Sequence, residues 1–481
     1  MPDCKLYING EWKNTVSGKI TENINPATGK PMGMVQQAGP IEVGDAIKAA
    51  HLAFPAWSAT LPAQREEILL KAAEYMAQNK DRFTDWLIDE SGSTFTKASD
   101  EISQTIAILR DAAGECRRLE GKVFVPEVPG QLSTCVRVPL GVVAGIAPFN
   151  YPVVQAACKS AYAIAAGNTF VLKPASDTPL SGNIMAECYE AAGLPAGVFN
   201  AVAGSGSVVG NALVESPLVR YITYTGSTEV GRDINLKCAA QFKRCALELG
   251  GKNPFIVLKD YDVDEAVSIA AFGAFYHQGQ ICMCTSRIIV EAPIYDEFCR
   301  KFAAKAASIK MGDPHEKDTI VGPLINDRHY AVLDELIADA KKKGANLLCG
   351  GKHDGAFYAP SVLANVTDEM RIFHEECFGP VTSIVKAENA EDALRLANDN
   401  IYGLSSALLT NDLRLAMTMA SRIEAGMVHV NDSTVMGTRR APYGGIKNSG
   451  IGRENGSYSV EEFTELKWIT YQTQKNTYPT D

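Results

Sequence analysis

Apolar positions in the N-terminal part of the chain recur at i, i+3 and i+4, the spacing typical of amphipathic helices. Ahead of them, Asn9 and Gly10 separate two short apolar runs, a sequence that favours a tight hairpin turn. We therefore expect a hairpin followed by four helices, at residues 41–58, 62–79, 81–91 and 100–119.

From residue 141 the pattern changes to short, wholly apolar runs that alternate with longer periodic segments. Such alternation predicts a mostly parallel sheet covered by helices on both faces, with a ligand site at the carboxyl ends of the strands. The expected strands are 141–148, 169–173, 198–202, 219–224 and 245–249, and the expected helices are 153–166, 180–192, 208–215 and 229–240.

A second alternating block runs from Lys252 to about Val428. Its expected strands are 254–257, 287–290 and 382–385, and its expected helices are 263–275, 295–306, 330–343, 390–397 and 413–423. Strand patterns also occur at 131–138 and, at the end of the chain, at 463–471. A terminal strand outside its own sheet often completes a neighbour's sheet, so this strand predicts an oligomer.

Composition narrows the possible partners and compartment. The formal net charge of −10 argues against nucleic acid or an anionic membrane as the main partner. We find neither an apolar run of about 18 residues nor a secretory signal pattern, so no membrane span is expected. Twelve cysteines without framework spacing predict reduced thiols and a cytoplasmic location. Cys282 and Cys284 lack a second ligand pair, and no metal site is expected.

Three residues suggest catalytic chemistry, although each also has an ordinary structural explanation. Cys282 follows a Gly-Gln step and precedes a β-rich run, which suits a partly exposed nucleophile as well as a packed thiol. Asn150, between two prolines, is either an oxyanion donor or a turn residue. Glu248, before two glycines, is either a desolvated general base or an exposed loop residue. Two small-residue loops, 204–210 and 225–231, open helices where a pyrophosphate could approach.

Seven such segments occur in order along essentially the whole chain. Together they resemble the NAD(P)-dependent aldehyde dehydrogenase superfamily, and their details are closest to aromatic aldehyde dehydrogenases of the benzaldehyde and vanillin type. The segments are Phe149–Pro152, Val171–Ser176, Gly226–Gly231, Glu248–Asn253, Gly279–Cys282, Glu375–Pro380 and Pro442–Arg453.

The resemblance implies an α/β fold with a Rossmann-like parallel-sheet cofactor domain, a second α/β catalytic domain and a small β oligomerisation arm. The implied boundaries are 1–119 and 141–250 for the cofactor domain, 251–430 for the catalytic domain, and 120–140 and 459–481 for the arm. Residues 431–458 would form a substrate and anchor loop that returns to the cofactor domain. A homodimer or homotetramer is implied.

In this family the thiolate of the residue matching Cys282 attacks an aldehyde, and the resulting oxyanion is held by the residue matching Asn150 and by the backbone N–H of the cysteine. The resemblance makes Glu248 the base that hydrolyses the thioester. The cofactor, NADP or NAD, would be bound by Ile146, Pro148, Phe149, Lys173, Ser176, Gly206, Gly226, Ser227, Leu249, Glu376 and Phe378. Strongly NAD-preferring relatives carry glutamate where this chain has Ser176, so NADP is expected to be accepted.

The substrate is expected to be an aromatic aldehyde. Succinate-semialdehyde dehydrogenases share the Cys282–Cys284 pair but bind a carboxylate with two arginines, and those positions are Cys158 and Tyr276 here. Tyr151, Tyr276 and Met283 would suit an aromatic ring. Arg439 and Arg440 keep an acidic semialdehyde or another aliphatic aldehyde as the alternative, although adjacent loop residues seldom both face one pocket. A catalytically inactive relative with a binding role is the remote alternative.

Overall fold

The computed structural model describes residues 2–480. Its larger sheet has eight strands in the order β2-β1-β9-β8-β7-β10-β11-β21. The five strands from β9 to β11 are parallel to one another, and β1, β2 and β21 add antiparallel edges. Their bounds are β1 Leu6–Ile8, β2 Glu11–Lys13, β7 Val142–Ile146, β8 Thr169–Lys173, β9 Phe199–Ala201, β10 Val219–Thr225, β11 Arg244–Glu248 and β21 Gly450–Ile451.

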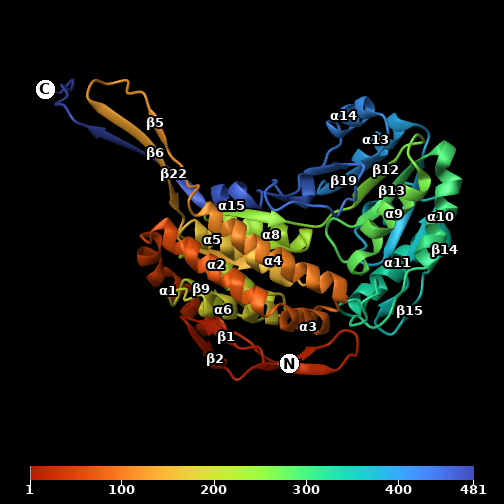
Figure 1. The fold of residues 1–481 in the computed structure, drawn as a ribbon, viewed down its shortest axis with the longest axis horizontal. Coiled ribbons are helices and arrows are strands. Elements are labelled where there is room, and N and C mark those ends of the chain that lie inside the picture. The colour runs from red at the N-terminus through yellow and green to blue at the C-terminus, as the bar shows by residue number, and fades with distance from the viewer. Residues whose placement is uncertain (1, 481) are drawn as a thin grey trace.

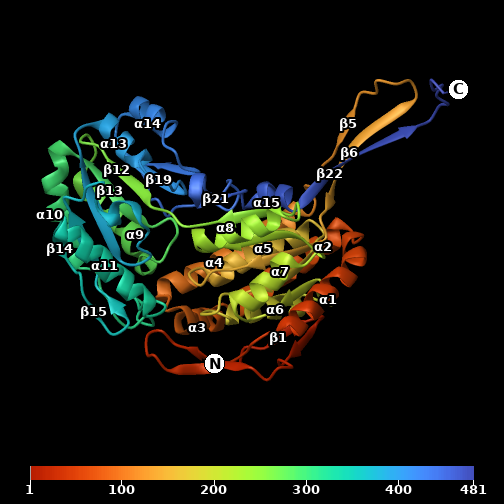
Figure 2. The ribbon, with the colours of Figure 1, turned by 180° about the vertical axis from the view of Figure 1, so that it is seen from behind.

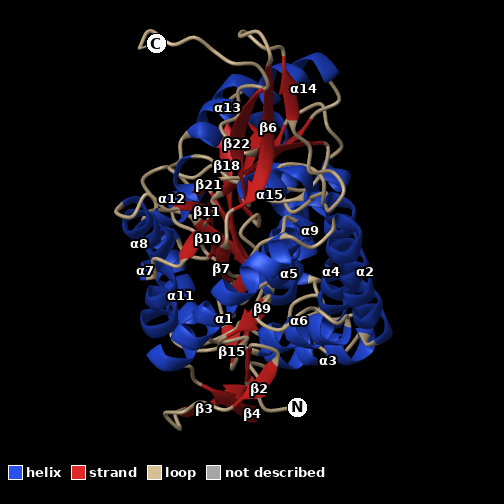
Figure 3. Ribbon diagram, turned by 90° about the vertical axis from the view of Figure 1, so that its left-hand side faces the viewer, coloured by secondary structure: helices blue, strands red, loops and turns tan. Residues whose placement is uncertain are grey.

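Helices cover both faces of this sheet, as Figure 3 shows end-on. Because side chains alternate along a strand, successive residues of β7 and β8 belong to two separate apolar cores, one under each helical layer. One layer contains α1 (Pro40–Ser58), α7 (Asn211–Glu215) and α8 (Thr228–Ala239). The other contains α2 (Pro62–Gln78), α3 (Lys80–Ser91), α4 (Phe95–Glu115), α5 (Pro152–Ala165) and α6 (Leu180–Ala191).

A second sheet of seven strands lies beside the first (Figures 1 and 2). Its order is β14-β17-β18-β13-β12-β19-β20, parallel except for β14. The strands are β12 Asn253–Val257, β13 Thr285–Glu291, β14 Asn346–Cys349, β17 Ser361–Ala364, β18 Val381–Ala387, β19 Ser405–Leu409 and β20 Met427–Val430. The helices are α9 Val263–Phe275, α10 Tyr295–Ala307, α11 Arg328–Lys342, α12 Arg371–His374, α13 Ala390–Asn398 and α14 Leu413–Ala420.

A three-stranded arm projects from the body of the molecule (Figure 1). It consists of β5 (Lys122–Phe124), β6 (Gln131–Pro139) and β22 (Thr464–Gln472), with β6 in the middle. All nine residues of β22 pair with β6 of the same chain. The terminal strand therefore lies outside the two large sheets and pairs with the other segment predicted to form the arm. Within residues 2–480, however, the outer edge of β22 has no pairing strand.

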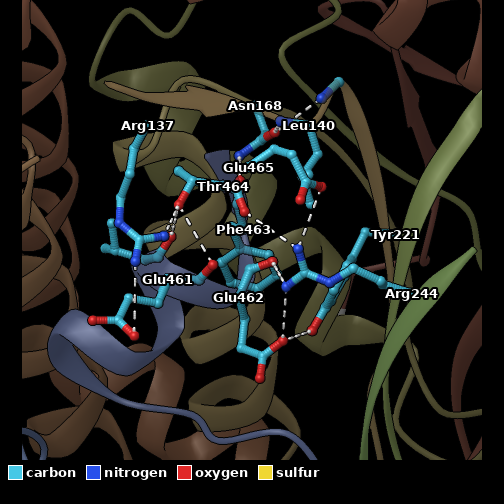
Figure 4. Close-up of polar contacts among 12 residues, drawn as sticks. Arg137, Leu140, Asn168, Tyr221, Arg244, Glu461, Glu462, Phe463, Thr464 and Glu465 are labelled. Atoms are coloured by element: carbon cyan, nitrogen blue, oxygen red, sulfur yellow. Dashed lines mark hydrogen bonds and ion pairs between the residues drawn. The ribbon is translucent and has the colours of Figure 1, made fainter. Parts of the chain in front are cut away.

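The base of the arm is anchored to the first sheet by a polar cluster (Figure 4). Arg244 donates to the carbonyl oxygens of Thr464 (3.3 Å) and Glu462 (3.2 Å), and Tyr221 donates to the Glu462 carboxylate (2.7 Å). Asn168 donates to the carbonyl of Phe463 at 2.9 Å. A cavity of about 400 Å³ at this junction is lined in part by Arg244, Glu462 and Thr464 and contains none of the predicted site residues.

Most predicted elements are confirmed with shifts of a few residues. The largest difference is α4, which begins at Phe95 instead of residue 100 and ends at Glu115 instead of residue 119. The first turn of α4 is mostly polar, so the apolar periodicity that predicts the helix begins about one turn after the helix itself. Four strands of the second sheet (β14, β17, β19 and β20) were not predicted, because small and polar residues such as those of β19 weaken the strand pattern. None of the helices described between residues 2 and 480 is long and apolar enough to cross a membrane.

Candidate active site

A cavity of about 370 Å³ is lined by residues of α4, α5 and α9, the loop after α9, and residues 435–443. Segments more than 300 positions apart in the sequence therefore meet at one place. The structure brings five of the predicted site residues together on its walls: Asn150, Tyr151, Tyr276, Cys282 and Met283.

The loop that carries Cys282 has an unusual backbone. His277, Gln278 and Gly279 have φ values of 51°, 55° and 68°, three consecutive residues in the left-handed region that non-glycine residues rarely adopt. The Gln278 amide donates to the carbonyl oxygens of Gly92 and Pro323, each at 2.9 Å, and holds this turn against the end of α3 and the segment before α11. A Cβ on Gly279 would lie 2.3 Å from the carbonyl oxygen of Gly379, so only glycine fits there.

The Cys282 thiol has one side-chain partner, the Tyr443 hydroxyl, at 3.2 Å. Its carbonyl oxygen accepts a hydrogen bond of 2.8 Å from the Asn253 amide, which fixes the backbone at the nucleophile position. Burial raises the pKa of the thiol to about 12, while the hydrogen bond with Tyr443 opposes this shift. The sulfur therefore carries its proton at neutral pH in this structure, unlike the thiolate that the sequence position suggests.

Asn150 lies between β7 and α5, with only 4% of its surface exposed. Its side-chain amide donates to the carbonyl oxygen of Gln280 at 2.9 Å. Gln280 precedes Cys282 by two residues, so this bond ties the asparagine side chain to the cysteine loop. The amide nitrogen is a hydrogen-bond donor on a residue that lines the same cavity as Cys282, and a donor is what a developing oxyanion requires.

Glu248 ends β11 and is buried, but it does not line the cavity. Neither of its carboxylate oxygens has a hydrogen-bond partner. Burial raises its pKa well above the usual value, and the nearby Glu454 carboxylate raises it further. Lys159 partly offsets this shift and itself forms a buried ion pair of 2.6 Å with Glu454. Gly444 packs closely against this carboxylate, since a Cβ there would lie 2.7 Å from its Oε1 atom.

The predicted cofactor residues follow the carboxyl ends of adjacent parallel strands. Ile146 ends β7, Lys173 ends β8, and Gly226 and Leu249 follow β10 and β11. Gly206 opens the turn after β9, with no atom within 4 Å of where its Cβ would lie. This edge is where ligands bind in open α/β sheets.

The polar groups along this edge differ in burial and charge. Ser227 caps α8 by accepting from the N–H of Val230 at 3.4 Å. The Lys173 ammonium donates to the carbonyl of Pro174 at 3.0 Å, and burial lowers its pKa to about 8. Ser176 lies nearby in sequence and is exposed.

Glu376 and Phe378 reach the same edge from the second sheet. The Glu376 carboxylate accepts from the N–H of Gly251 at 3.1 Å, and burial raises its pKa to about 7. The Phe378 ring contacts the Phe149 ring edge-on, with centroids 5.6 Å apart, and Pro148 precedes Phe149. The structure therefore connects the predicted residues of the two sheets through direct contacts.

Known proteins resemble this chain in both sequence and structure. The model of the aldehyde dehydrogenase family matches residues 12–469. This chain belongs to the aldehyde dehydrogenase family. A benzaldehyde dehydrogenase of Bacillus subtilis is 41% identical over 99% of this chain and 98% of its own length. A vanillin dehydrogenase of Corynebacterium glutamicum is 42% identical, covering 97% of each chain, and a glutarate-semialdehyde dehydrogenase of Pseudomonas putida is 38% identical, also over 97% of each.

Solved structures agree in fold with this aldehyde dehydrogenase. A salicylaldehyde dehydrogenase from Pseudomonas putida G7, complexed with salicylaldehyde, superposes with a TM-score of 0.97 at 37% identity over 100% of both chains. A betaine aldehyde dehydrogenase from Staphylococcus aureus in complex with NAD+ gives 0.97 at 33% identity, covering 99% and 96%. An NADP-dependent enzyme of E. coli gives 0.96 at 37%, covering 98% of each. The predicted fold class is confirmed, and the protein is an NAD(P)-dependent oxidoreductase acting on aldehydes.

The two arginines considered for an acidic substrate have different surroundings in this aldehyde dehydrogenase. Arg439 lines the cavity, together with Cys158, and its buried Nε atom has no hydrogen-bond partner. Arg440 pairs instead with Asp111 at 3.8 Å. Only one of the two adjacent residues therefore lines the substrate cavity.

Sequence reasoning missed Tyr443, the hydroxyl beside the nucleophile. The glycine-rich segment Pro442–Arg453 contains it, and the position of this tyrosine between a proline and a glycine was the one sequence feature that could have indicated its role. It also missed the ion pair between Lys159 and Glu454, because 295 residues separate its partners. Within residues 2–480, no three His, Cys, Asp or Glu side chains are arranged to hold a metal ion.

Proposed function

We propose that this aldehyde dehydrogenase oxidises an aromatic aldehyde to its carboxylic acid through a thiohemiacetal and a thioester on Cys282. The observation that carries the proposal is the composition of the cavity around Cys282. Tyr151, Tyr276 and Met283 line it next to the sulfur and the Asn150 amide, so an aromatic ring and its formyl group each have suitable contacts.

In the first half of the reaction, the Cys282 thiol gives up its proton to water, and the thiolate sulfur attacks the carbonyl carbon. The Tyr443 hydroxyl, 3.2 Å from the sulfur, stabilises the thiolate because its hydrogen bond lowers the thiol pKa. The Asn150 amide and the backbone N–H of Cys282 donate to the oxyanion of the thiohemiacetal. Neutralising the new charge with two donors lowers the barrier to its formation.

The residues at the strand ends fit a dinucleotide. Ser176 and the Lys173 ammonium are donors suited to a ribose or its phosphate, the small residues Gly206, Gly226 and Ser227 admit a pyrophosphate, and the Glu376 carboxylate accepts from ribose hydroxyls. Ile146, Pro148, Phe149, Leu249 and Phe378 offer apolar surface. When bound, the nicotinamide cofactor supplies the hydride acceptor that converts the thiohemiacetal to the thioester.

In the second half, Glu248 acts as the general base for the water that attacks the thioester. Burial without a hydrogen-bond partner keeps its pKa high, which makes its carboxylate a stronger base than an exposed glutamate. Hydrolysis releases the acid and returns the thiol of Cys282. The proton that Glu248 takes from the water passes to the sulfur as the thiol re-forms, and this restores the carboxylate.

A substrate panel tests the proposal. The purified protein is mixed with benzaldehyde, vanillin, glutarate semialdehyde and succinate semialdehyde, each with NADP and with NAD, and reduced-cofactor absorbance is followed. We expect kcat/KM for the aromatic aldehydes to exceed that for the semialdehydes by about tenfold or more, since one or two kcal/mol of apolar contact distinguishes them. A semialdehyde as the fastest substrate would refute the aromatic assignment.

Arg439 supports a second candidate, an aldehyde with an acidic group. Its guanidinium lines the cavity and one nitrogen is unpartnered, so it is available to a carboxylate or phenolate on the substrate. Adding 4-carboxybenzaldehyde to the panel separates the cases. If an acidic group is recognised, Arg439→Leu lowers its kcat/KM by about tenfold or more and leaves benzaldehyde unchanged, whereas Arg440→Leu, the matched control, alters neither.

NADP acceptance is assigned to Ser176. A serine in place of a carboxylate removes the repulsion of a 2′-phosphate and leaves Lys173 free to attract it. Ser176→Glu should lower kcat/KM with NADP by about tenfold or more while that with NAD is kept or improved. Equal changes with both cofactors would contradict the assignment.

A further inference from the structure

A lysine and a glutamate form a fully buried ion pair on α4, next to the cavity. Lys97 and Glu101 are one helical turn apart, and both are 0% exposed. The Lys97 Nζ and Glu101 Oε2 atoms are 2.5 Å apart. Nothing in the catalytic sequence proposed above uses this pair.

The remaining hydrogen bonds of the pair end on the segment that carries Asn150. The Lys97 ammonium also donates to the carbonyl oxygen of Asn150 at 2.5 Å and to the Ser93 hydroxyl at 3.0 Å, so all three of its donors are used. The second oxygen of Glu101 accepts from the N–H groups of Val153 (2.8 Å) and Val154 (3.2 Å), in the first turn of α5. The pair therefore fixes the backbone on both sides of Tyr151 and Pro152.

The same ammonium contacts a wall of the cavity. Its Nζ atom lies 4.2 Å from the centroid of the Tyr151 ring, within the range of a cation–π interaction. The same ring also meets the His277 ring, with centroids 5.8 Å apart and planes at 71°. Tyr151 thus contacts both the lysine and the left-handed turn that precedes Cys282.

Global stability alone does not explain such a pair. Burial disfavours the charged lysine and lowers its pKa, and the Glu101 carboxylate opposes that shift. Replacing a buried ion pair by apolar side chains of similar volume is often neutral or stabilising, because two desolvated charges recover little net free energy. Here the hydrogen bonds orient one particular segment, which an apolar pair would leave without directional contacts.

We propose that Lys97 and Glu101 are positioning residues that hold the Asn150 amide and the Tyr151 ring in register with Cys282. The proposal rests on the role assigned to Asn150 under the proposed function. Asn150 donates to Gln280 on one side while its own carbonyl accepts from Lys97 on the other. Its amide is therefore fixed from both ends, and loss of one end displaces the donor that the oxyanion needs.

The test is a double-mutant cycle with Asn150. The variant Lys97→Met/Glu101→Met removes both charges at similar volume and avoids leaving one buried charge unpaired. It is made in the wild-type and in the Asn150→Ala background, and the pre-steady-state rate of reduced-cofactor formation is measured with benzaldehyde. We expect a fall of about tenfold to a hundredfold in the wild-type background, the cost of a small misplacement of a catalytic group. In the Asn150→Ala background the rate should change little, with KM changing less than kcat throughout.

Lys80→Met is the matched control, because Lys80 also donates to a side chain of α4, Ser103, at 2.8 Å but lies outside the cavity. Its rates should equal those of the wild type. Equal falls in both backgrounds would overturn the proposal, as would unchanged kinetics or a double variant that does not fold, since the pair would then be structural. Failure of the wild-type protein to oxidise any aldehyde would instead refute the proposed function.

Discussion

At the scale of single residues, the chemistry of this aldehyde dehydrogenase depends on burial more than on residue type. Cys282 and Glu248 both have pKa values raised by desolvation. The desolvated thiol, which is partly exposed to the cavity, and the buried carboxylate both favour their protonated forms at rest. Their reactivity therefore depends on neighbouring donors and charges: Tyr443 for the sulfur, and Lys159 with Glu454 for the carboxylate.

Glu248→Gln should separate the two halves of the reaction. The amide cannot act as a base, but the nucleophile and the oxyanion donors are retained. One equivalent of reduced cofactor should form in a burst, followed by turnover about a hundredfold to ten-thousandfold slower than that of the wild type. Rapid-mixing absorbance measurements show both phases, and equal losses of burst and turnover would contradict the role of base.

The pH dependence of kcat should reflect the ionisation of the Glu248 carboxyl group. Its raised pKa means that the base form accumulates only as pH rises through that value, so deacylation increases with pH. Glu454→Gln removes a negative charge that raises this pKa and leaves the Lys159 cation unpaired. Both effects move the rising limb of the kcat profile to lower pH. Glu462→Gln, at the base of the arm, should leave the limb unchanged, and a shift to higher pH in Glu454→Gln would exclude this explanation.

At the scale of elements, the turn between α9 and Cys282 determines where the sulfur lies. Left-handed backbone at His277 and Gln278 is costly, and the hydrogen bonds from Gln278 to Gly92 and Pro323 maintain it. The sequence shows only one glycine in this turn. The strain at His277 and Gln278 comes from packing against distant segments.

Gly279→Ala should disturb both stability and activity. The added Cβ meets the carbonyl oxygen of Gly379 in a region of φ unfavourable to alanine. We expect a loss of about 1–3 kcal/mol in the free energy of unfolding and a reduced burst of hydride transfer. Gly312→Ala is the control, because a Cβ there has open space and φ is not positive. Urea unfolding followed by activity measurements compares the two, and equal stabilities would show that the turn tolerates a side chain.

At the scale of the whole molecule, the arm is the part whose apolar surface and strand edge a single chain leaves uncovered. Its strands expose large apolar side chains, including Val123 (74%), Trp468 (69%) and Leu466 (61%). The edge of β22 has no partner within residues 2–480, and an exposed apolar edge strand readily pairs with another chain. We therefore propose that the arm mediates a homodimer or homotetramer.

Leu466→Glu/Trp468→Glu should dissociate the proposed oligomer, because two carboxylates replace apolar contacts on one face of β22. Light scattering coupled to size-exclusion chromatography measures the mass directly. Lys467→Glu, on the opposite face of the same strand, is the control and should keep the mass of the wild type. An unchanged mass in the double variant would place the interface elsewhere.

The sequence by itself determined the family, the two α/β blocks and the identity of Cys282, Asn150 and Glu248 as candidate site residues. These features rest on local patterns: apolar period, small-residue turns and short ordered motifs. Only the tertiary structure decided that Tyr443 meets the thiol, that Arg439 lines the cavity while Arg440 does not, and that Lys97 reaches the carbonyl of Asn150. Those contacts depend on packing between segments far apart in the chain, and no local sequence pattern predicts such packing.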